Sequence, residues 1–172
     1  DPASPGAIGG TTPGSGAFTT VTLSNRYSNT SQDYLLIGTS AMLNGTGDGT
    51  VLTIAWDAPD IDIGSNFSGS TYTAPVTGVY RVSIMLRTYG YVSGHTYGVL
   101  NIVSSNNTFM GDYVQKTFDN TGTVVMYNAV LDIDMDAADT LTTTLIVGEG
   151  TQVVDVESGY GNGAAMSIFL AS

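Results

Sequence analysis

Residues 66–84 read NFSGSTYTAPVTGVYRVSI, and this stretch decides the fold. Residues 71–73 are β-branched or aromatic and favour an extended backbone. Pro75 cannot donate a hydrogen bond to a neighbouring strand, so we expect the first strand to end there. A turn is predicted over residues 75–78, because proline fixes φ and glycine accepts a positive φ without steric cost. Residues 79–86 then alternate, with Tyr80 and its apolar successors on one face, which predicts a long strand.

This stretch resembles the signature of the C1q/TNF-like jelly-roll family, in which an aromatic residue, threonine, alanine and proline precede a Gly-Val-Tyr run and an alternating strand. The resemblance continues to the end of the chain and covers about residues 52–172. Asp136–Leu141 is similar to the family's turn before its penultimate long strand, and Ala164–Leu170 takes the place of its closing strand. Ser167 and Ile168 depart from the glycine and aromatic residue that are usual there.

The resemblance implies an all-β, antiparallel jelly-roll sandwich of about ten strands. It also implies a homotrimer, and a recognition head in place of an enzyme. The rest of the chain agrees with the fold class, since short alternating segments are separated by glycine and asparagine turns throughout. The segments that we expect to be strands are residues 34–42, 50–56, 70–74, 79–89, 96–103, 113–118, 123–135, 140–147, 152–156 and 165–171. Trp56 is expected in the core.

Composition limits the partners. The formal charge of the 172-residue chain is −11, with 15 acidic and only four basic residues. Nucleic acid and anionic membranes are therefore poor partners, because binding to phosphate needs clustered Lys and Arg. No apolar run is long enough to predict insertion into a membrane. The absence of cysteine argues against a small disulfide-rich scaffold.

The N-terminal residues differ from the rest, being rich in Gly, Pro and Thr and poor in large apolar side chains. We therefore divide the chain into an extended linker or shaft end, residues 1–25, and a head domain, residues 26–172. Residues 8–21, IGGTTPGSGAFTTV, look like the shaft linker of bacteriophage tail-fibre proteins. The alternative is a generic flexible linker. The resemblance predicts a viral protein, located outside the cell on the virion as part of a tail fibre.

A candidate receptor-binding segment lies between two expected strands, at residues 89–97. Tyr89, Tyr91, His95 and Tyr97 crowd a glycine-rich turn. Aromatic side chains beside small polar residues form good recognition surfaces, and sugars stack on flat rings. The expected partner is a glycan or a protein of the bacterial surface. The alternative is that these tyrosines pack at strand ends or between the copies of a trimer.

A second candidate is a calcium site, the only cofactor that the sequence suggests. Asp132, Asp134 and Asp136 have the spacing that begins a calcium loop, but Ala137 and Thr143 occupy positions where an EF-hand needs glycine and a carboxylate. The alternative is the solvent-exposed face of a strand. C1q-like trimers often bind calcium, so the resemblance keeps the site open. Asp57, Asp60 and Asp62 form a further acidic cluster.

No catalytic residue is predicted. His95 is the only histidine, and no Gly-x-Ser-x-Gly motif accompanies it. The leading hypothesis is therefore a non-enzymatic, trimeric head of a phage tail fibre that attaches to a host receptor. A structural filament subunit is the alternative, in which a strand carrying Phe18, Val21 and Leu23 completes a neighbour's sheet. A small glycosidase or depolymerase using paired carboxylates is the third.

Overall fold

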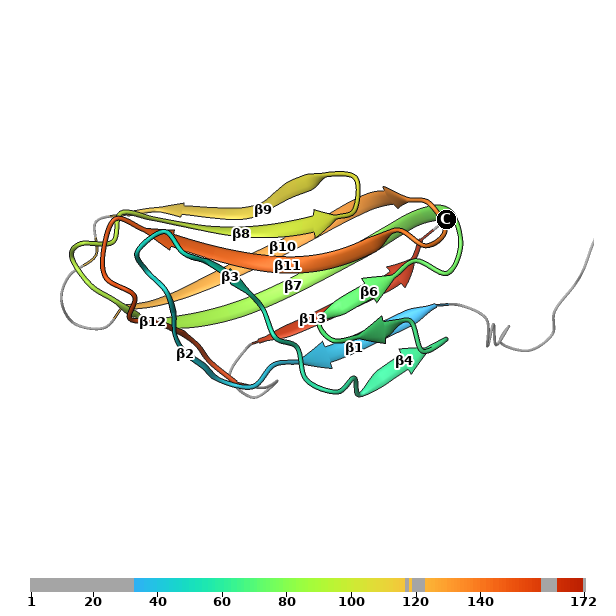
Figure 1. The fold of residues 1–172 in the computed structure, drawn as a ribbon, viewed down its shortest axis with the longest axis horizontal. Helices are drawn as coiled ribbons and strands as arrows, with labels where there is room; N and C mark the ends of the chain where they lie inside the picture. Colours follow the sequence, from blue (N-terminus) through green and yellow to red (C-terminus); the bar gives the residue numbers. More distant parts are fainter. Residues whose placement is uncertain (1–32, 117, 119–122, 159–163, 172) are drawn as a thin grey trace, which may run out of the picture.

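The computed structural model describes residues 33–116, 118, 123–158 and 164–171, and within them the chain is built from strands alone (Figure 1). These residues contain no helix that could cross a membrane. The strands are β1 (Tyr34–Gly38), β2 (Met42–Thr46), β3 (Val51–Thr53), β4 (Ile61–Ile63), β5 (Phe67–Ser68), β6 (Thr71–Thr73), β7 (Gly78–Tyr91), β8 (Tyr97–Ser104), β9 (Thr108–Gln115), β10 (Thr123–Met135), β11 (Thr140–Gly148), β12 (Val154–Val156) and β13 (Ala165–Leu170).

The first of two antiparallel sheets is organised around β7. Strand β10 pairs along one edge of β7 over nearly its whole length, and β13 and then β12 pair along the other edge. Beyond β13 lie β1 and β4, and beyond β12 lies β2. The second sheet is organised around β11, which has β8 and then β9 on one side, and β3, β6 and β5 on the other.

The turn in residues 75–78 carries the chain from the second sheet into the first. The hydroxyl of Tyr80 donates a hydrogen bond of 2.7 Å to the carbonyl of Val76, which closes the turn from inside. The backbone of Ala74, just before it, is hydrogen-bonded to Asp139 and Ala138 of the β10–β11 turn, at 2.8 Å each. The segment between β6 and β7 is thus hydrogen-bonded to the turn between β10 and β11.

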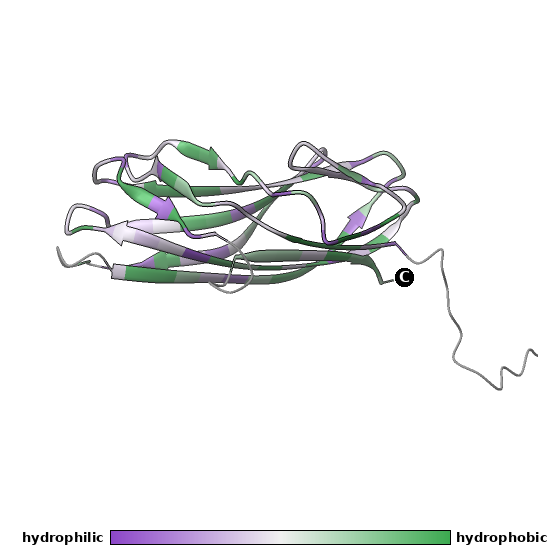
Figure 2. Cartoon of the chain, turned by 90° about the horizontal axis from the view of Figure 1, so that it is seen from below, coloured by the Kyte–Doolittle hydropathy of each residue, from purple (hydrophilic) through white to green (hydrophobic). Residues whose placement is uncertain are grey.

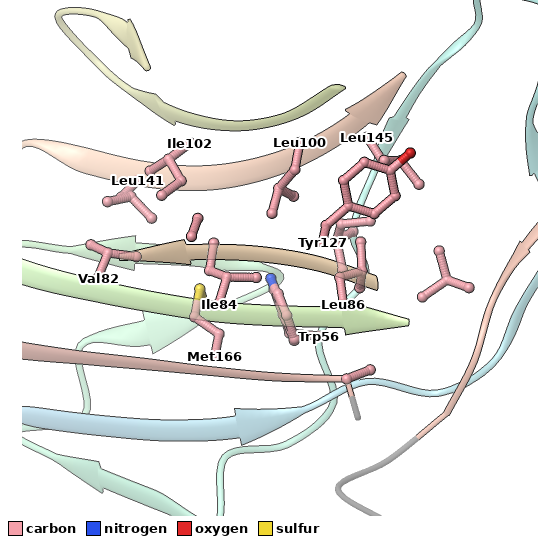
Figure 3. Close-up of a cluster of buried hydrophobic side chains, with 14 of the residues drawn as sticks. Trp56, Val82, Ile84, Leu86, Leu100, Ile102, Tyr127, Leu141, Leu145 and Met166 are labelled. Carbon is pink, nitrogen blue, oxygen red and sulfur yellow. The ribbon is translucent and has the colours of Figure 1, made fainter. Parts of the chain in front are cut away.

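The core lies between the two sheets and follows from the two-residue period of the strands, which is visible as alternating colours in Figure 2. Along β7, Tyr80, Val82 and Leu86 have no exposed surface. The facing strands contribute Leu100, Ile102 and Leu145 among others (Figure 3). Trp56 is 7% exposed, which confirms its expected place in the core, and its indole N–H donates to the Thr143 hydroxyl at 2.8 Å.

Strand limits agree with the sequence where apolar alternation is strong. Strand β10 has the predicted bounds. Strand β9 was wrongly expected to start at Tyr113, because Gly111 looks like a turn residue. The strand starts at Thr108 and runs through Gly111, which lies at an irregularity in the pairing with β8 and packs closely on Ala129. The described residues hold thirteen strands against the ten expected. Three strands were missed. The strand expected over residues 34–42 was wrong, since β1 ends at Gly38 and a separate strand β2 begins at Met42, and β4 and β5 have only 3 and 2 residues.

Replacing Thr143 with valine should lower the free energy of unfolding by about 1–3 kcal/mol. Valine keeps the shape of the threonine side chain. The buried indole N–H of Trp56, however, loses its hydrogen-bond acceptor, and an unsatisfied buried donor destabilises the folded state. Urea denaturation followed by tryptophan fluorescence measures the change. Thr144→Val is the matched control: it lies one residue along β11, on the solvent side. An equal loss in both variants would contradict the assignment.

Candidate functional site

The predicted receptor-binding residues lie where β7 ends and β8 begins. This end of the sandwich is opposite the one where β1 begins and β13 ends (Figure 1). The four side chains do not form one surface. Tyr91 and His95 are fully buried, Tyr89 is 44% exposed and Tyr97 is half-buried. Receptor binding by this set stays a prediction, and the side chains that can reach a partner directly are Tyr89 and Tyr97.

His95 ties three loops together from inside. Its Nδ1 accepts a hydrogen bond of 2.9 Å from the backbone N–H of Val92, so that nitrogen carries no proton. The proton on Nε2 can therefore be donated to the carbonyl of Thr151, 2.9 Å away. Gly47 and Gly150 press against the ring, and a Cβ at either would overlap it. The β7–β8, β11–β12 and β2–β3 loops thus share one buried anchor.

Tyr91 belongs to a second internal network at the same end. Its hydroxyl lies 2.6 Å from the hydroxyl of Tyr127, and the Thr88 hydroxyl donates to it at 3.2 Å. Burial raises the pKa of both tyrosines, so both stay protonated. The ring of Tyr91 also packs edge-on against His95, with centroids 5.6 Å apart. Sequence analysis found this aromatic cluster but could not tell that half of it faces inward.

The two exposed tyrosines point to different faces of the sandwich. Tyr89 continues the solvent-facing phase of β7 on the first sheet. Tyr97 lies in register with Gly148 on the second sheet, and its ring covers that glycine so closely that a Cβ there would overlap it. A ligand that contacts Tyr89 therefore approaches the first sheet, whereas a ligand that contacts Tyr97 approaches the second sheet.

The three aspartates predicted to bind calcium share the solvent face of β10 and its following residue. Asp132 accepts two hydrogen bonds of 2.7 Å from the Arg81 guanidinium, which lower the pKa of its carboxyl. Asp136 accepts a longer one, 3.4 Å, from Thr77. No three metal-ligating side chains come together anywhere in the described residues. Calcium binding at Asp132, Asp134 and Asp136 stays a prediction that needs ligands from elsewhere.

Members of the second acidic cluster serve local structure. Asp57 accepts a hydrogen bond of 2.6 Å from the Ser40 hydroxyl. Asp62 caps the following turn by accepting from the backbone N–H groups of Asn66 and Phe67, at 3.0 and 3.2 Å. Asp62 thus holds the connection from β4 to β5, which is the behaviour expected of aspartate in turns, whereas Asp57 joins the residues that follow β3 to those that follow β1.

Sequence analysis missed a buried carboxylate, Asp33, because a single aspartate before a strand carries no signal. It is 4% exposed and accepts hydrogen bonds from the hydroxyl of Tyr72 and from Nδ2 of Asn66. Burial raises the pKa of Asp33, the hydrogen bond from Asn66 partly offsets this, and the nearby Asp62 adds to the rise. The group links β1 to the second sheet.

The outer face of the first sheet carries a groove of about 230 Å³. Its floor is made of small side chains, Ser83, Ala165 and Ser167, on the two paired strands β7 and β13. Larger apolar side chains stand around it, among them Met85 and Val130, which are 38% and 66% exposed. The alternation along β7 places Ser83 and Met85 on one face, but the sequence does not show that this face is hollow and apolar.

Comparison with solved structures gives the fold. The globular domain of zebrafish complement 1qA protein matches with a TM-score of 0.52 and 11% identity, over 81% of this chain and 98% of that chain. The chain has the C1q/TNF-like jelly-roll fold. Murine APRIL, crystallised at pH 8.0, matches this jelly roll with a TM-score of 0.51 and 11% identity, over the same shares of the two chains. No family model matches the sequence, and no curated protein matches it.

The fold expectation is therefore confirmed. The tail-fibre linker and the assembly residues Phe18, Val21 and Leu23 lie outside the described residues, as does the whole of residues 1–25. The linker, the filament alternative and the domain boundary stay predictions.

Replacing His95 with phenylalanine should lower the free energy of unfolding by about 1–3 kcal/mol, because the partly buried hydrogen bonds to the N–H of Val92 and the carbonyl of Thr151 are both lost. Chemical denaturation monitored by circular dichroism measures the change. Tyr89→Phe, at an exposed position at the same end, should leave stability unchanged. Wild-type stability in the His95 variant would show that the ring does not anchor the loops.

The pH dependence of stability should carry the signature of Asp33. Its pKa in the folded chain is raised above the ordinary value of 3.8, so the folded state holds this proton more tightly than the unfolded state. The resulting stabilisation is present below pH 3.8 and is lost as pH rises through the folded pKa. Relative to Asp33→Asn, the wild type should therefore lose stability over that window. Urea titrations at several pH values test this, and a constant difference would contradict it.

Proposed function

We propose that this chain is a non-enzymatic recognition head that works as a homotrimer. It is carried at the end of a bacteriophage tail fibre, outside the cell, and attaches the virion to a glycan of the host surface. The resemblance of residues 66–84 to the C1q/TNF-like family supports the trimer. The resemblance of residues 8–21 to a tail-fibre shaft linker supports the fibre. The observation that carries the proposal is the apolar groove on the outer face of the first sheet.

The surface around the groove is suited to contact between copies of an acidic chain. Two of the four basic residues, Arg81 and Arg87, lie on this face, and each is paired with a carboxylate, Asp132 and Glu157. The pairs neutralise charge that would otherwise make copies repel one another. Small floor residues allow close approach, and Met85 and Val130 supply apolar area that gains from burial.

The position of β1 supports the proposal of a head on a shaft. Strand β1 starts beside the end of β13, where Tyr34 pairs with Phe169 and Ala171 donates to the carbonyl of Val79. A shaft formed by residues 1–25 would therefore join at this end, which places the β7–β8 loop at the far end (Figure 1). Three such heads on one shaft raise avidity without any new contact.

A catalytic role for the single histidine finds no support, because both ring nitrogens are hydrogen-bonded to the backbone. A general base needs a free nitrogen within reach of a substrate. The buried histidine thus supports a role in binding and not in catalysis.

The variant Ala165→Arg should convert the trimer into monomers, because a long cation placed on the groove floor blocks the approach of a second copy. Light scattering across a range of concentrations measures the mass of wild type and variant. Thr142→Arg is the matched control, on an equally central strand of the other sheet, and should leave the mass unchanged. Both variants must keep the wild-type circular dichroism.

A wild-type mass of one protomer at every concentration would overturn the proposal. A trimer that survives Ala165→Arg would move the contact away from the groove.

A further inference from the structure

The outer face of the second sheet is built from four strands that lie far apart in the sequence. Strand pairing places Tyr113, Val99, Ile146 and Val51 in one row across β9, β8, β11 and β3. The next row along consists of Met110, Asn101, Thr144 and Thr53. Neighbouring residues of β8 and β11, such as Leu100 and Leu145, point into the core, so both rows face solvent.

This face combines exposed apolar surface with hydroxyl and amide groups. Tyr113 is 46% exposed, Met110 63% and Val51 57%. Between them stand the hydroxyls of Thr144 and Thr53 and the amide of Asn101. An exposed apolar patch that is surrounded by polar groups is typical of a binding surface.

The two rows carry no charge. The two rows, together with the residues that extend them on either side, Gln115, Tyr97, Gly148, Thr108, Val103 and Thr142, include none of the chain's 15 acidic or four basic residues. In a chain with a net charge of −11 this is a notable exclusion. Lys116, next to Gln115, and Glu149, next to Gly148, lie beyond the end of the rows and carry opposite charges. An anionic ligand over the rows would therefore meet the repulsion of the whole molecule, whereas a neutral ligand would not.

Two tyrosine rings, those of Tyr97 and Tyr113, shape this face. Tyr97 is held against Gly148, which has no side chain to lift the ring away from the sheet. Tyr113 stands on the neighbouring strand opposite Val99, two positions further along β8, which places it on a diagonal about 7–8 Å from Tyr97. Flat rings beside hydroxyl and amide partners are suited to sugar rings, which offer C–H faces and hydroxyl edges.

We propose that this face, centred on Tyr97, Tyr113, Asn101 and Thr144, binds an uncharged saccharide chain. The inference rests on the proposed function and specifies its receptor as a neutral glycan. Tyr97 and Tyr113 contact sugar rings, while Asn101 and Thr144 bond to sugar hydroxyls. If the groove of the first sheet is covered by other copies, the second sheet faces outward in the assembled head and is free for this contact.

The test uses the full chain in its native oligomeric state and an array of immobilised oligosaccharides. One set is neutral, built from glucose, galactose, rhamnose and N-acetylglucosamine, and a matched set contains uronic acid. The wild type should bind members of the neutral set and not their acidic counterparts. Binding should also be insensitive to added salt, because no ion pairs are involved.

Two variants locate the site. Tyr113→Ala removes an exposed ring, and Asn101→Asp keeps the shape but adds a charge to the face. Each should weaken binding about tenfold, which is the scale of one lost aromatic contact. Leu43→Ala, which removes an exposed apolar side chain from β2 of the first sheet, is the matched control and should bind as the wild type does. All three should keep the wild-type melting temperature.

Failure to bind any neutral glycan, or binding to the acidic set alone, overturns the inference. Loss of binding in Leu43→Ala, or unchanged binding in both Tyr113→Ala and Asn101→Asp, overturns the location. These outcomes are distinct from failure of the proposed function, which is read from the oligomeric mass. A trimer without neutral-glycan binding refutes only the inference, and a monomer that binds neutral glycan refutes only the trimeric head.

Discussion

Strand β7 must satisfy three partners at once, and the rest of the structure depends on this constraint. One edge is hydrogen-bonded to β10 over nearly its full length, and the other is shared in succession by β13 and β12. Its inner face supplies Tyr80, Val82 and Leu86 to the core, while its outer face supplies the floor of the groove. A shift of one residue would exchange the two faces, so the register is strongly specified. The closed turn before Tyr80 sets where that register begins.

The sequence was sufficient for the elements whose alternation is long. Strand β10 was predicted with its correct bounds because Ile133 and Met135 alternate with exposed aspartates, and only a half-buried strand explains that pattern. The start of β9 was not predictable in the same way, since Gly111 looks like a turn until its close packing on Ala129 is known. Strands of two or three residues, such as β5, are defined by their partners and not by any local pattern.

The candidate sites show a sharper division. A list of aromatic residues near a glycine-rich turn brought together side chains at one end of the molecule, but burial decides their roles. Tyr91 and His95 are structural supports, whereas Tyr97 reaches a surface. The uncharged face of the second sheet could not be foreseen at all, because its rows join residues as distant as Val51 and Ile146. Such a surface exists only after the strands have paired.

The interior position of His95 has a consequence for how the loops around it can vary over generations. Because one buried ring and the two glycines against it hold three loops in place, the outward side chains of those loops carry little of the burden of stability. The outward side chains of such loops are therefore the positions where substitutions should be tolerated best, provided that the histidine and its glycines are left untouched.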